Sequence, residues 1–110
     1  MHRRRMSYRV SAPAEADLIG IARYTRRHWG HDRAAAYIDG LFESFQRLSG
    51  TLEVGHKRDD LRSGLRVVLH MQHYHICYRI DGDEVQILRV IHTRRDLARQ
   101  IAVLRGTDRR

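Results

Sequence analysis

The sequence has very little cysteine and proline and no long apolar run. Cys77 is its one cysteine, so an internal disulfide and a zinc site built from several cysteines are both excluded. Pro13 is its one proline, so little interrupts helices or strands after that point. No stretch approaches the roughly 18 consecutive apolar residues of a membrane span, and no apolar run follows the basic start MHRRRM as it would in a signal peptide. We therefore expect a cytoplasmic protein with no membrane partner.

Lysine is almost absent as well, although the chain is strongly basic. All but one of its 21 basic residues are arginine, the exception being Lys57, and with 13 acidic residues the formal charge is +8. Arginine binds carboxylates and phosphates through paired hydrogen bonds, so this composition favours an anionic or carboxylate-rich partner. A GC-rich genome would also produce an arginine excess, and composition alone does not separate the two explanations.

The length and composition indicate one folded domain. The chain has 110 residues and is 42% hydrophobic, which is enough for a single core. We expect a flexible basic leader at residues 1–6, one domain at residues 7–105 and a flexible tail at residues 106–110.

The first half of the chain predicts a short strand and two helices. The strand is expected at residues 8–10, and Ser11 is a suitable N-cap for the helix that follows. Apolar side chains then recur at helical spacing in two segments, at Leu18, Ile21, Ala22, Thr25 and Trp29, and at Ala35, Ile38, Leu41, Phe42, Phe45 and Leu48. Gly30 ends the first helix, Asp32 caps the second and Gly50 ends it. The short connection predicts an antiparallel helical hairpin.

The second half predicts a loop, three antiparallel strands and a short helix. Residues 51–64 show no periodicity and are expected to be a loop, whereas residues 65–71, 74–80 and 85–91 alternate apolar and other side chains. The Asp81-Gly82 turn predicts that Ile80 pairs with Asp83 and Arg79 with Glu84. Residues 96–104 predict a short helix. The fold class is therefore α+β, with the N-terminal strand and helical hairpin packed on an antiparallel sheet whose other face is only half apolar.

Three blocks of the sequence, in this order, resemble the ParE branch of the RelE/ParE superfamily of type II toxin–antitoxin toxins. They are YRVSAPAEADLIGIARYTRRHWG at residues 8–30, AAAYIDGLFESFQRL at residues 34–48, and DDLRSGLRVVLHMQHYHICYRIDGDEVQILRVIHTRRDLARQI at residues 59–101. The combination is specific although no single motif is decisive. Cys77 and Tyr74 depart from the residues typical of the family, which are a bulky apolar residue and a histidine.

The resemblance implies a toxin that blocks replication by poisoning DNA gyrase and is neutralised by a ParD-like antitoxin encoded nearby. Such modules inhibit growth and stabilise plasmids. The RelE branch cleaves messenger RNA on the ribosome instead, and a degenerate toxin that only binds antitoxin is a third possibility. The residues that RNA cleavage would require help to choose between these possibilities.

A nuclease would need a general base, a proton donor and cations for the phosphate. His92 is the one candidate base near the end of the last strand, and Arg66, Arg79 and Arg94 supply charge. No tyrosine follows Tyr78, and arginine is a poor base because it stays protonated. We therefore favour binding without catalysis, with ribosome-dependent RNase activity as the alternative.

The arginines near the C-terminus are the expected contact residues. We expect the target surface to include Arg89, His92, Arg94 and Arg95. We expect an acidic, amphipathic antitoxin segment to contact Arg94, Arg95, Leu97, Arg99, Ile101 and Arg105. No DNA-reading motif is visible, so DNA contact is expected only through the antitoxin or gyrase.

The remaining candidate chemistry is weak. The spacing His70-x-x-His73-x-His75 is typical of metal ligands, but a turn separates His70 from the others and no acidic residue lies nearby. Cys77 lies two residues from His75 in an apolar strand, where a buried inert thiol is the commoner situation. We expect neither a metal nor a cofactor.

Overall fold

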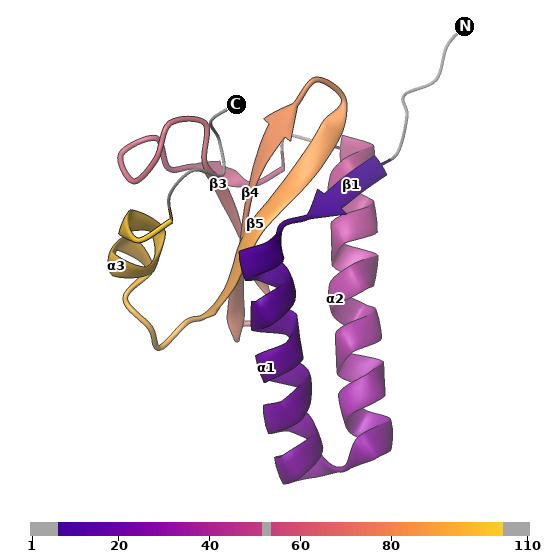
Figure 1. Ribbon diagram of the computed structural model, residues 1–110. Coiled ribbons are helices and arrows are strands. Elements are labelled where there is room, and N and C mark those ends of the chain that lie inside the picture. The colour runs from indigo at the N-terminus through magenta and orange to yellow at the C-terminus, as the bar shows by residue number, and fades with distance from the viewer. Residues whose placement is uncertain (1–6, 52–53, 105–110) are drawn as a thin grey trace, which may run out of the picture.

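The computed structural model describes residues 7–51 and 54–104 and has a helical hairpin on one face of a sheet and a short helix on the other (Figure 1). In chain order the elements are β1 (Ser7–Val10), α1 (Ala12–Trp29), α2 (His31–Thr51), β2 (His56–Lys57), β3 (Arg66–His70), β4 (Tyr74–Asp81), β5 (Glu84–His92) and α3 (Leu97–Ala102). The predicted α+β class is confirmed. The predicted leader, the predicted tail and Arg105 lie outside the described residues.

The strands form one mixed sheet in the order β1-β5-β4-β3-β2. β1 pairs with β5 in parallel, with Tyr8 opposite Val85, and the other neighbouring strands are antiparallel. The prediction of an unbroken loop over residues 51–64 is wrong in part, because α2 continues to Thr51 and β2 pairs with β3. A strand of two residues is too short to produce a visible alternation in the sequence.

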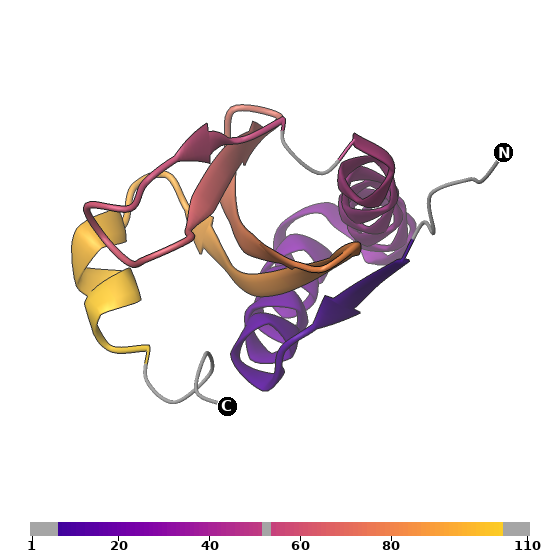
Figure 2. The ribbon, with the colours of Figure 1, turned by 90° about the horizontal axis from the view of Figure 1, so that it is seen from above.

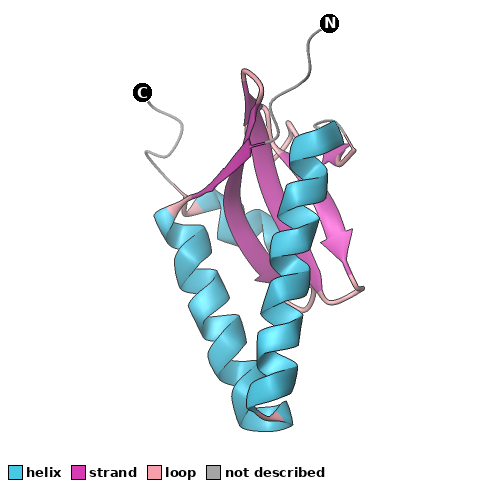
Figure 3. Ribbon diagram, turned by 90° about the vertical axis from the view of Figure 1, so that its right-hand side faces the viewer, coloured by secondary structure: helices cyan, strands magenta, loops and turns pink. Residues whose placement is uncertain are grey.

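Ser11 fixes the start of α1 and ties it to the sheet. Its hydroxyl oxygen accepts a hydrogen bond from the Ala14 N–H at 3.2 Å and donates one to the Leu88 carbonyl at 3.0 Å. At the other end of α1, Gly30 adopts a φ of +93° and its N–H bonds to the Arg26 carbonyl. These two positions confirm the predicted cap and stop, and they set the antiparallel hairpin seen in Figure 3.

The larger core lies between the hairpin and the sheet. Its buried residues are Ala14, Leu18, Ile21, Leu41, Phe45, Leu48, Ile76, Tyr78, Val85, Ile87 and Val90. The predictions for Trp29, Ala35 and Phe42 are wrong, because all three side chains are exposed. Trp29 is the last residue of α1, and Figures 1 and 3 show that this end of the hairpin extends beyond the sheet. Helical periodicity shows on which face of the helix a residue lies, but not whether the sheet extends far enough to cover that residue.

The predicted register of the β4–β5 hairpin is wrong by two residues. Asp81 pairs with Glu84 and Ile80 with Val85, because Gly82, at a φ of +67°, occupies the first loop position. Arg79 therefore lies opposite Gln86 and does not face Glu84. An even shift leaves side chains on their predicted faces up to an irregularity between Cys77 and Tyr78.

Beyond that irregularity the β5 side chains change faces. Val90 joins the core under the hairpin, whereas Ile91 joins a second core on the opposite face. This smaller core contains Leu65, Val67, Cys77, Leu88, Ile91, Ile101 and Leu104, with Leu61 and Leu97 at its edge. Figure 2 shows the sheet lying between the hairpin and α3. The second face is thus covered by α3 and by the segment before β3, which corrects the expectation of an incompletely covered sheet.

Within the described ranges, no helix combines the length and apolar character that a bilayer crossing requires.

Candidate functional site

Arg89 is part of an internal ion pair. Its guanidinium donates to both carboxylate oxygens of Asp17 in α1, with N···O distances of 2.7 and 3.0 Å, and the Val90 N–H donates to the same carboxylate at 2.8 Å. The hydrogen bond from Arg89 to Asp17 raises the pKa of Arg89. Both side chains are largely buried. Arg89 therefore holds α1 against β5, and of the four residues expected on the target surface it is the one that forms an ion pair with another described residue.

His92 ends β5 with one ring nitrogen occupied. The Arg94 N–H donates to His92 Nδ1 at 3.0 Å, and the ring lies edge-on to Tyr74. Burial lowers the pKa of His92, and the positive charges of Arg94 and His73 lower it further. A neutral imidazole that accepts at Nδ1 carries its proton on Nε2. The free nitrogen is therefore a hydrogen-bond donor, which suits contact with an anion better than it suits proton abstraction.

Exposed cations lie in the turn between β5 and α3, at Arg94 and Arg95, and in the adjoining α3, at Arg99. Arg94, Arg95 and Arg99 are exposed, and none of the three forms an ion pair with another described residue. We call these three residues the basic turn. The apolar residues predicted beside them behave differently: Leu97 is half-buried and Ile101 is 1% exposed, both packed in the second core. Without movement of α3, Ile101 is not available to a partner.

The four residues of the RNase alternative are not gathered in one place, because Arg66 and Arg79 lie on opposite faces of the sheet and His92 lies at the other end of β4. Arg66 pairs with Tyr78 across the sheet and donates to the Gly55 carbonyl at 3.1 Å, and Arg79 lies one position further along β4. His92 pairs with Tyr74 at the other end of β4 and bonds to Arg94. Tyr74 and Tyr78 are four residue steps apart along the strand, which is about 13 Å. One scissile phosphate does not reach both groups.

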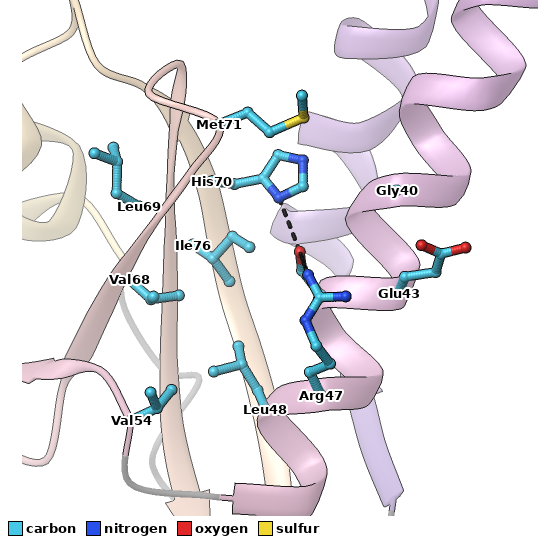
Figure 4. Close-up of a pocket in the computed structure, with 11 residues that line it drawn as sticks. Gly40, Glu43, Arg47, Leu48, Val54, Val68, Leu69, His70, Met71 and Ile76 are labelled. Carbon is cyan, nitrogen blue, oxygen red and sulfur yellow. Dashed lines mark hydrogen bonds between the residues drawn. The ribbon is translucent and has the colours of Figure 1, made fainter.

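A groove that the sequence did not predict lies between α2 and β3 (Figure 4). Its volume is about 490 Å³ and its apolar lining includes Leu48, Val54, Val68, Leu69, Met71 and Ile76. Val54, Leu69 and Met71 are exposed at 59%, 45% and 64%. We call this feature the α2–β3 groove. The sequence signal was the run of apolar residues in β3, which we assigned to the core.

The upper wall of the α2–β3 groove is a polar contact between its two elements. Ser44 Oγ lies 2.8 Å from His70 Nδ1, and Arg47 donates to Ser44 Oγ at 3.0 Å. Figure 4 shows His70 and Arg47 facing one another across the groove, with Met71 above them. Burial lowers the pKa of His70, as do the charges of Arg47 and His73, which favours the neutral ring at pH 7. The contact fastens β3 to α2.

A second cavity, of about 540 Å³, lies at the end of the hairpin. We call it the hairpin-tip cavity. It is lined by Tyr24, Thr25, Trp29, Arg33, Tyr37, His73, Tyr74, His92, Thr93 and Arg94. His92 and Arg94 were expected to be functional, Trp29 was assigned to the apolar face of the first helix, and Tyr24 and Arg33 were not singled out. The cavity forms because the hairpin projects past the sheet, and no local pattern in the sequence encodes that projection.

The histidine motif and Cys77 are dispersed or buried. His70 ends β3, His73 lies in the following turn and His75 is in β4. Among the described residues, no three His, Cys, Asp or Glu side chains gather at metal-binding distance. Burial raises the pKa of Cys77 to about 12, so its thiol is protonated and unreactive at neutral pH.

The arrangement of helices and strands defines a class of bacterial toxins. A chain of the chromosomal ParDE toxin–antitoxin system from P. aeruginosa superimposes with a TM-score of 0.68 and 26% identity, covering 79% of this chain and 95% of that one. A chain of the toxin–antitoxin complex RelBE2 from Mycobacterium tuberculosis gives a TM-score of 0.53 at 26% identity, covering 79% and 96%. The fold is thus similar to that of ParE and RelE toxins.

The sequence comparisons decide between the two branches. Residues 8–97 match the family model of the ParE toxin of the type II toxin–antitoxin system parDE. Toxin ParE of Escherichia coli is 34% identical over 96 residues, which are 87% of this chain and 93% of the relative. Toxin ParE3 of Caulobacter vibrioides is 34% identical over 89 residues, covering 81% and 88%. The chain therefore belongs to the ParE family of toxins from type II toxin–antitoxin systems.

Proposed function

We propose that this ParE-family toxin poisons DNA gyrase by binding and blocks replication until an antitoxin neutralises it. The match to the ParE family over residues 8–97 carries the proposal. The separation of the RNase candidates along β4, and the hydrogen bond that occupies His92 Nδ1, also favour binding over phosphodiester cleavage. Gyrase acts on chromosomal DNA, so the proposed site of action is the cytoplasm.

The proposed target surface is the basic turn together with His92. Arg94 and Arg95 project from a turn that is fixed at both ends by β5 and α3, and the Arg95 N–H bonds to the His92 carbonyl at 3.0 Å. Free guanidinium groups on a fixed turn suit a protein–DNA complex, because they can pair with carboxylates or phosphates. Arg89 contributes indirectly, by holding β5 against α1.

Controlled expression in a bacterial host separates the possible targets. We expect the toxin to cause loss of plasmid supercoiling, double-strand breaks and filamentation while messenger RNA stays intact. The Arg94→Gln/Arg95→Gln variant should lose most of this effect, and Arg23→Gln/Arg27→Gln, a pair of exposed arginines in α1, should retain it. Intact supercoiling with cleaved messenger RNA would contradict the proposal, and no growth defect at all would favour a degenerate toxin.

One observation supports ribosome-dependent RNase activity as a second candidate. His92, Tyr74 and Arg94 line the same cavity, so part of an acid–base set is assembled there. Purified toxin added to translating ribosomes tests it. Cleavage that is lost in His92→Ala would support the RNase, whereas intact messenger RNA at toxin concentrations that inhibit gyrase would exclude it.

We further propose that a ParD-like antitoxin occupies the α2–β3 groove. Met71 is exposed at the groove, and Leu69 is exposed on the opposite face of the same strand, so a partner segment that paired with the edge of β3 would contact both. Within the described residues β2 pairs only with Arg66 and Val67, so the outer edge of β3 is open from Val68 to His70. An extended antitoxin segment could add there as a strand and place apolar side chains in the groove. Its carboxylates would pair with Arg47 at the groove and with Arg99 in the basic turn.

Co-purification with the antitoxin encoded next to the toxin gene tests the assignment of this surface. Leu69→Asp/Met71→Asp should weaken antitoxin binding by at least about tenfold, since two apolar contacts are lost and charge is introduced. Val103→Asp is the matched control, because Val103 is also an apolar side chain that is 65% exposed. Equal loss in both variants, or in neither, would move the antitoxin to another surface.

A further inference from the structure

The hairpin-tip cavity combines aromatic rings with open faces. Tyr24 stacks on His28 with ring centroids 4.0 Å apart, and the Arg33 guanidinium carbon lies 5.3 Å from the centroid of the Trp29 ring. Each of these rings has a neighbour on one side, yet Tyr24 is 57% and Trp29 is 61% exposed. An exposed aromatic pair at a cavity mouth is costly to leave in water and provides stacking surfaces for a planar ligand.

The charge at this cavity has one sign. Arg33 enters from the first turn of α2 and Arg94 from the turn after β5, so two guanidinium groups from distant parts of the sequence line one site. His73 adds a third basic group, and the lining contains no aspartate or glutamate. Guanidinium groups next to aromatic rings are the combination that proteins use to hold a phosphate beside a stacked base.

Two further groups in the lining are hydrogen-bond donors with no acceptor among the described residues. Tyr37 lines the cavity, and its hydroxyl is buried and has no hydrogen-bond partner among the described residues. Burial and the neighbouring Tyr74 raise the pKa of Tyr37 to about 12, so it remains a phenol that can donate. His92, which accepts at Nδ1, keeps a donor on Nε2. A ligand with carbonyl or phosphate oxygens would accept from His92 Nε2, and reaching the buried Tyr37 hydroxyl would require that side chain to turn toward the cavity.

We propose that the hairpin-tip cavity binds a nucleoside phosphate, with the base stacked against Tyr24 or Trp29 and the phosphate held by Arg33 and Arg94. The volume of about 540 Å³ lies within the range of small-molecule sites. The ligand has two possible sources, a free nucleotide or an unpaired nucleotide of a DNA strand. The inference goes beyond the proposed function, because it concerns a ligand of the isolated toxin and requires neither gyrase nor antitoxin.

Trp29 makes the proposal directly measurable. It is the only tryptophan in the sequence and it lines the cavity, so its fluorescence reports on this site. The purified toxin is titrated with deoxyadenosine monophosphate, with an eight-nucleotide oligodeoxyadenylate and with inorganic phosphate. We expect saturable quenching by the first two and none by phosphate alone. Similar dissociation constants for both adenine probes would indicate a free nucleotide, and much tighter binding of the oligonucleotide would indicate a DNA strand.

Variants and salt then test how the ligand is held. Arg33→Gln and Arg94→Gln should each weaken binding about tenfold, as expected for loss of a hydrogen bond to a charged group. Arg23→Gln is the matched control, an exposed α1 arginine that does not line the cavity. If both guanidinium groups contact phosphate, a plot of the logarithm of oligonucleotide affinity against the logarithm of salt concentration should have a slope of about −1.4. Arg33→Gln removes one of the two contacts and should halve this slope.

Three results would overturn the proposal. One is the absence of quenching by either adenine probe, and another is an equal loss of affinity in Arg23→Gln and Arg33→Gln. The third is an unchanged affinity of both adenine probes for Arg94→Gln, together with quenching by an acidic peptide at the same concentrations. That result would assign the cavity to an antitoxin segment. Circular dichroism and thermal melting of each variant show whether it is folded, so a folding defect is not mistaken for loss of the site.

Discussion

The two faces of the sheet are covered in different ways. Two long helices, α1 and α2, cover one face over a core that contains the fully buried Phe45 and Tyr78. The six-residue α3 covers the other face, over a smaller core around Ile101. Both cavities lie on the hairpin side, whereas the basic turn leads into α3. The hairpin face thus carries the larger core and both of these cavities, and from the smaller core on the other face we predict that α3 opens locally more readily than the hairpin.

Truncation in the hairpin-side core should have the largest effect on stability. Phe45 is fully buried and contacts the rings of Tyr8 and Phe42 edge-on, so Phe45→Ala leaves a large cavity. We expect the free energy of unfolding to fall by about 3–5 kcal/mol, measured by chemical denaturation. Phe42→Ala is the control on the same helix, and its more exposed ring should cost much less. Equal losses would remove the distinction between the buried and exposed rings.

The second largest loss of stability should follow from breaking the ion pair between Asp17 in α1 and Arg89 in β5. Asp17→Ala leaves the largely buried Arg89 guanidinium unpaired and removes the acceptor of the Val90 N–H. We expect a loss of about 3 kcal/mol in the same measurement. In Asp17→Ala/Arg89→Met the unpaired charge is gone, so part of the loss should be recovered. A double variant no more stable than Asp17→Ala would show that the charge is not the cause.

Truncation on the α3 side should cost less and act locally. Ile101 is buried in the smaller core, so Ile101→Ala should cost about 2 kcal/mol and speed amide hydrogen exchange in α3 more than in α1. Val103→Ala, at a neighbouring exposed position, should change stability by less than about 0.5 kcal/mol. Uniformly faster exchange through all helices would mean that the two faces unfold as one unit.

The pH dependence should be the smallest effect, and His70 on the hairpin side should contribute to it. Burial lowers the pKa of His70, so the unfolded chain takes up a proton near pH 6.5 whereas the folded protein resists it. The free energy of unfolding should therefore fall as the pH drops from about 6.5 through the folded-state pKa, by at most about 1.4 kcal/mol per pH unit for this group. His70→Gln should reduce the slope, and part of it should remain because burial also lowers the pKa values of His75 and His92. An unchanged slope in His70→Gln would contradict the assignment.

Local sequence patterns predicted the helices and strands well, but not how these elements pair with one another. The Ser11 cap, the Gly30 stop and the alternation around Ile76 and Tyr78 are properties of short segments, and each is confirmed. The β4–β5 register was missed because Gly82 takes the first loop position, where the sequence favoured the second. The parallel pairing of β1 with β5 joins residues far apart in the chain, so no local signal contains it.

The candidate site was only partly predictable for the same reason. The exposed Arg94 and Arg95 follow a strand end that the alternation marks clearly. The pairing of Arg89 with Asp17 depends on how α1 crosses β5, and the burial of Ile101 depends on where α3 folds back. The α2–β3 groove and the hairpin-tip cavity exist only once distant elements are packed, which sequence spacing does not describe.

The most direct test of the proposed function is the amount of gyrase-linked DNA cleavage in a purified system. Gyrase and a supercoiled plasmid are incubated with increasing toxin, and linear DNA is measured after denaturing the enzyme. The account predicts dose-dependent linear DNA that the antitoxin suppresses and that Arg94→Gln/Arg95→Gln largely abolishes. Unchanged plasmid at every concentration of folded toxin would contradict it.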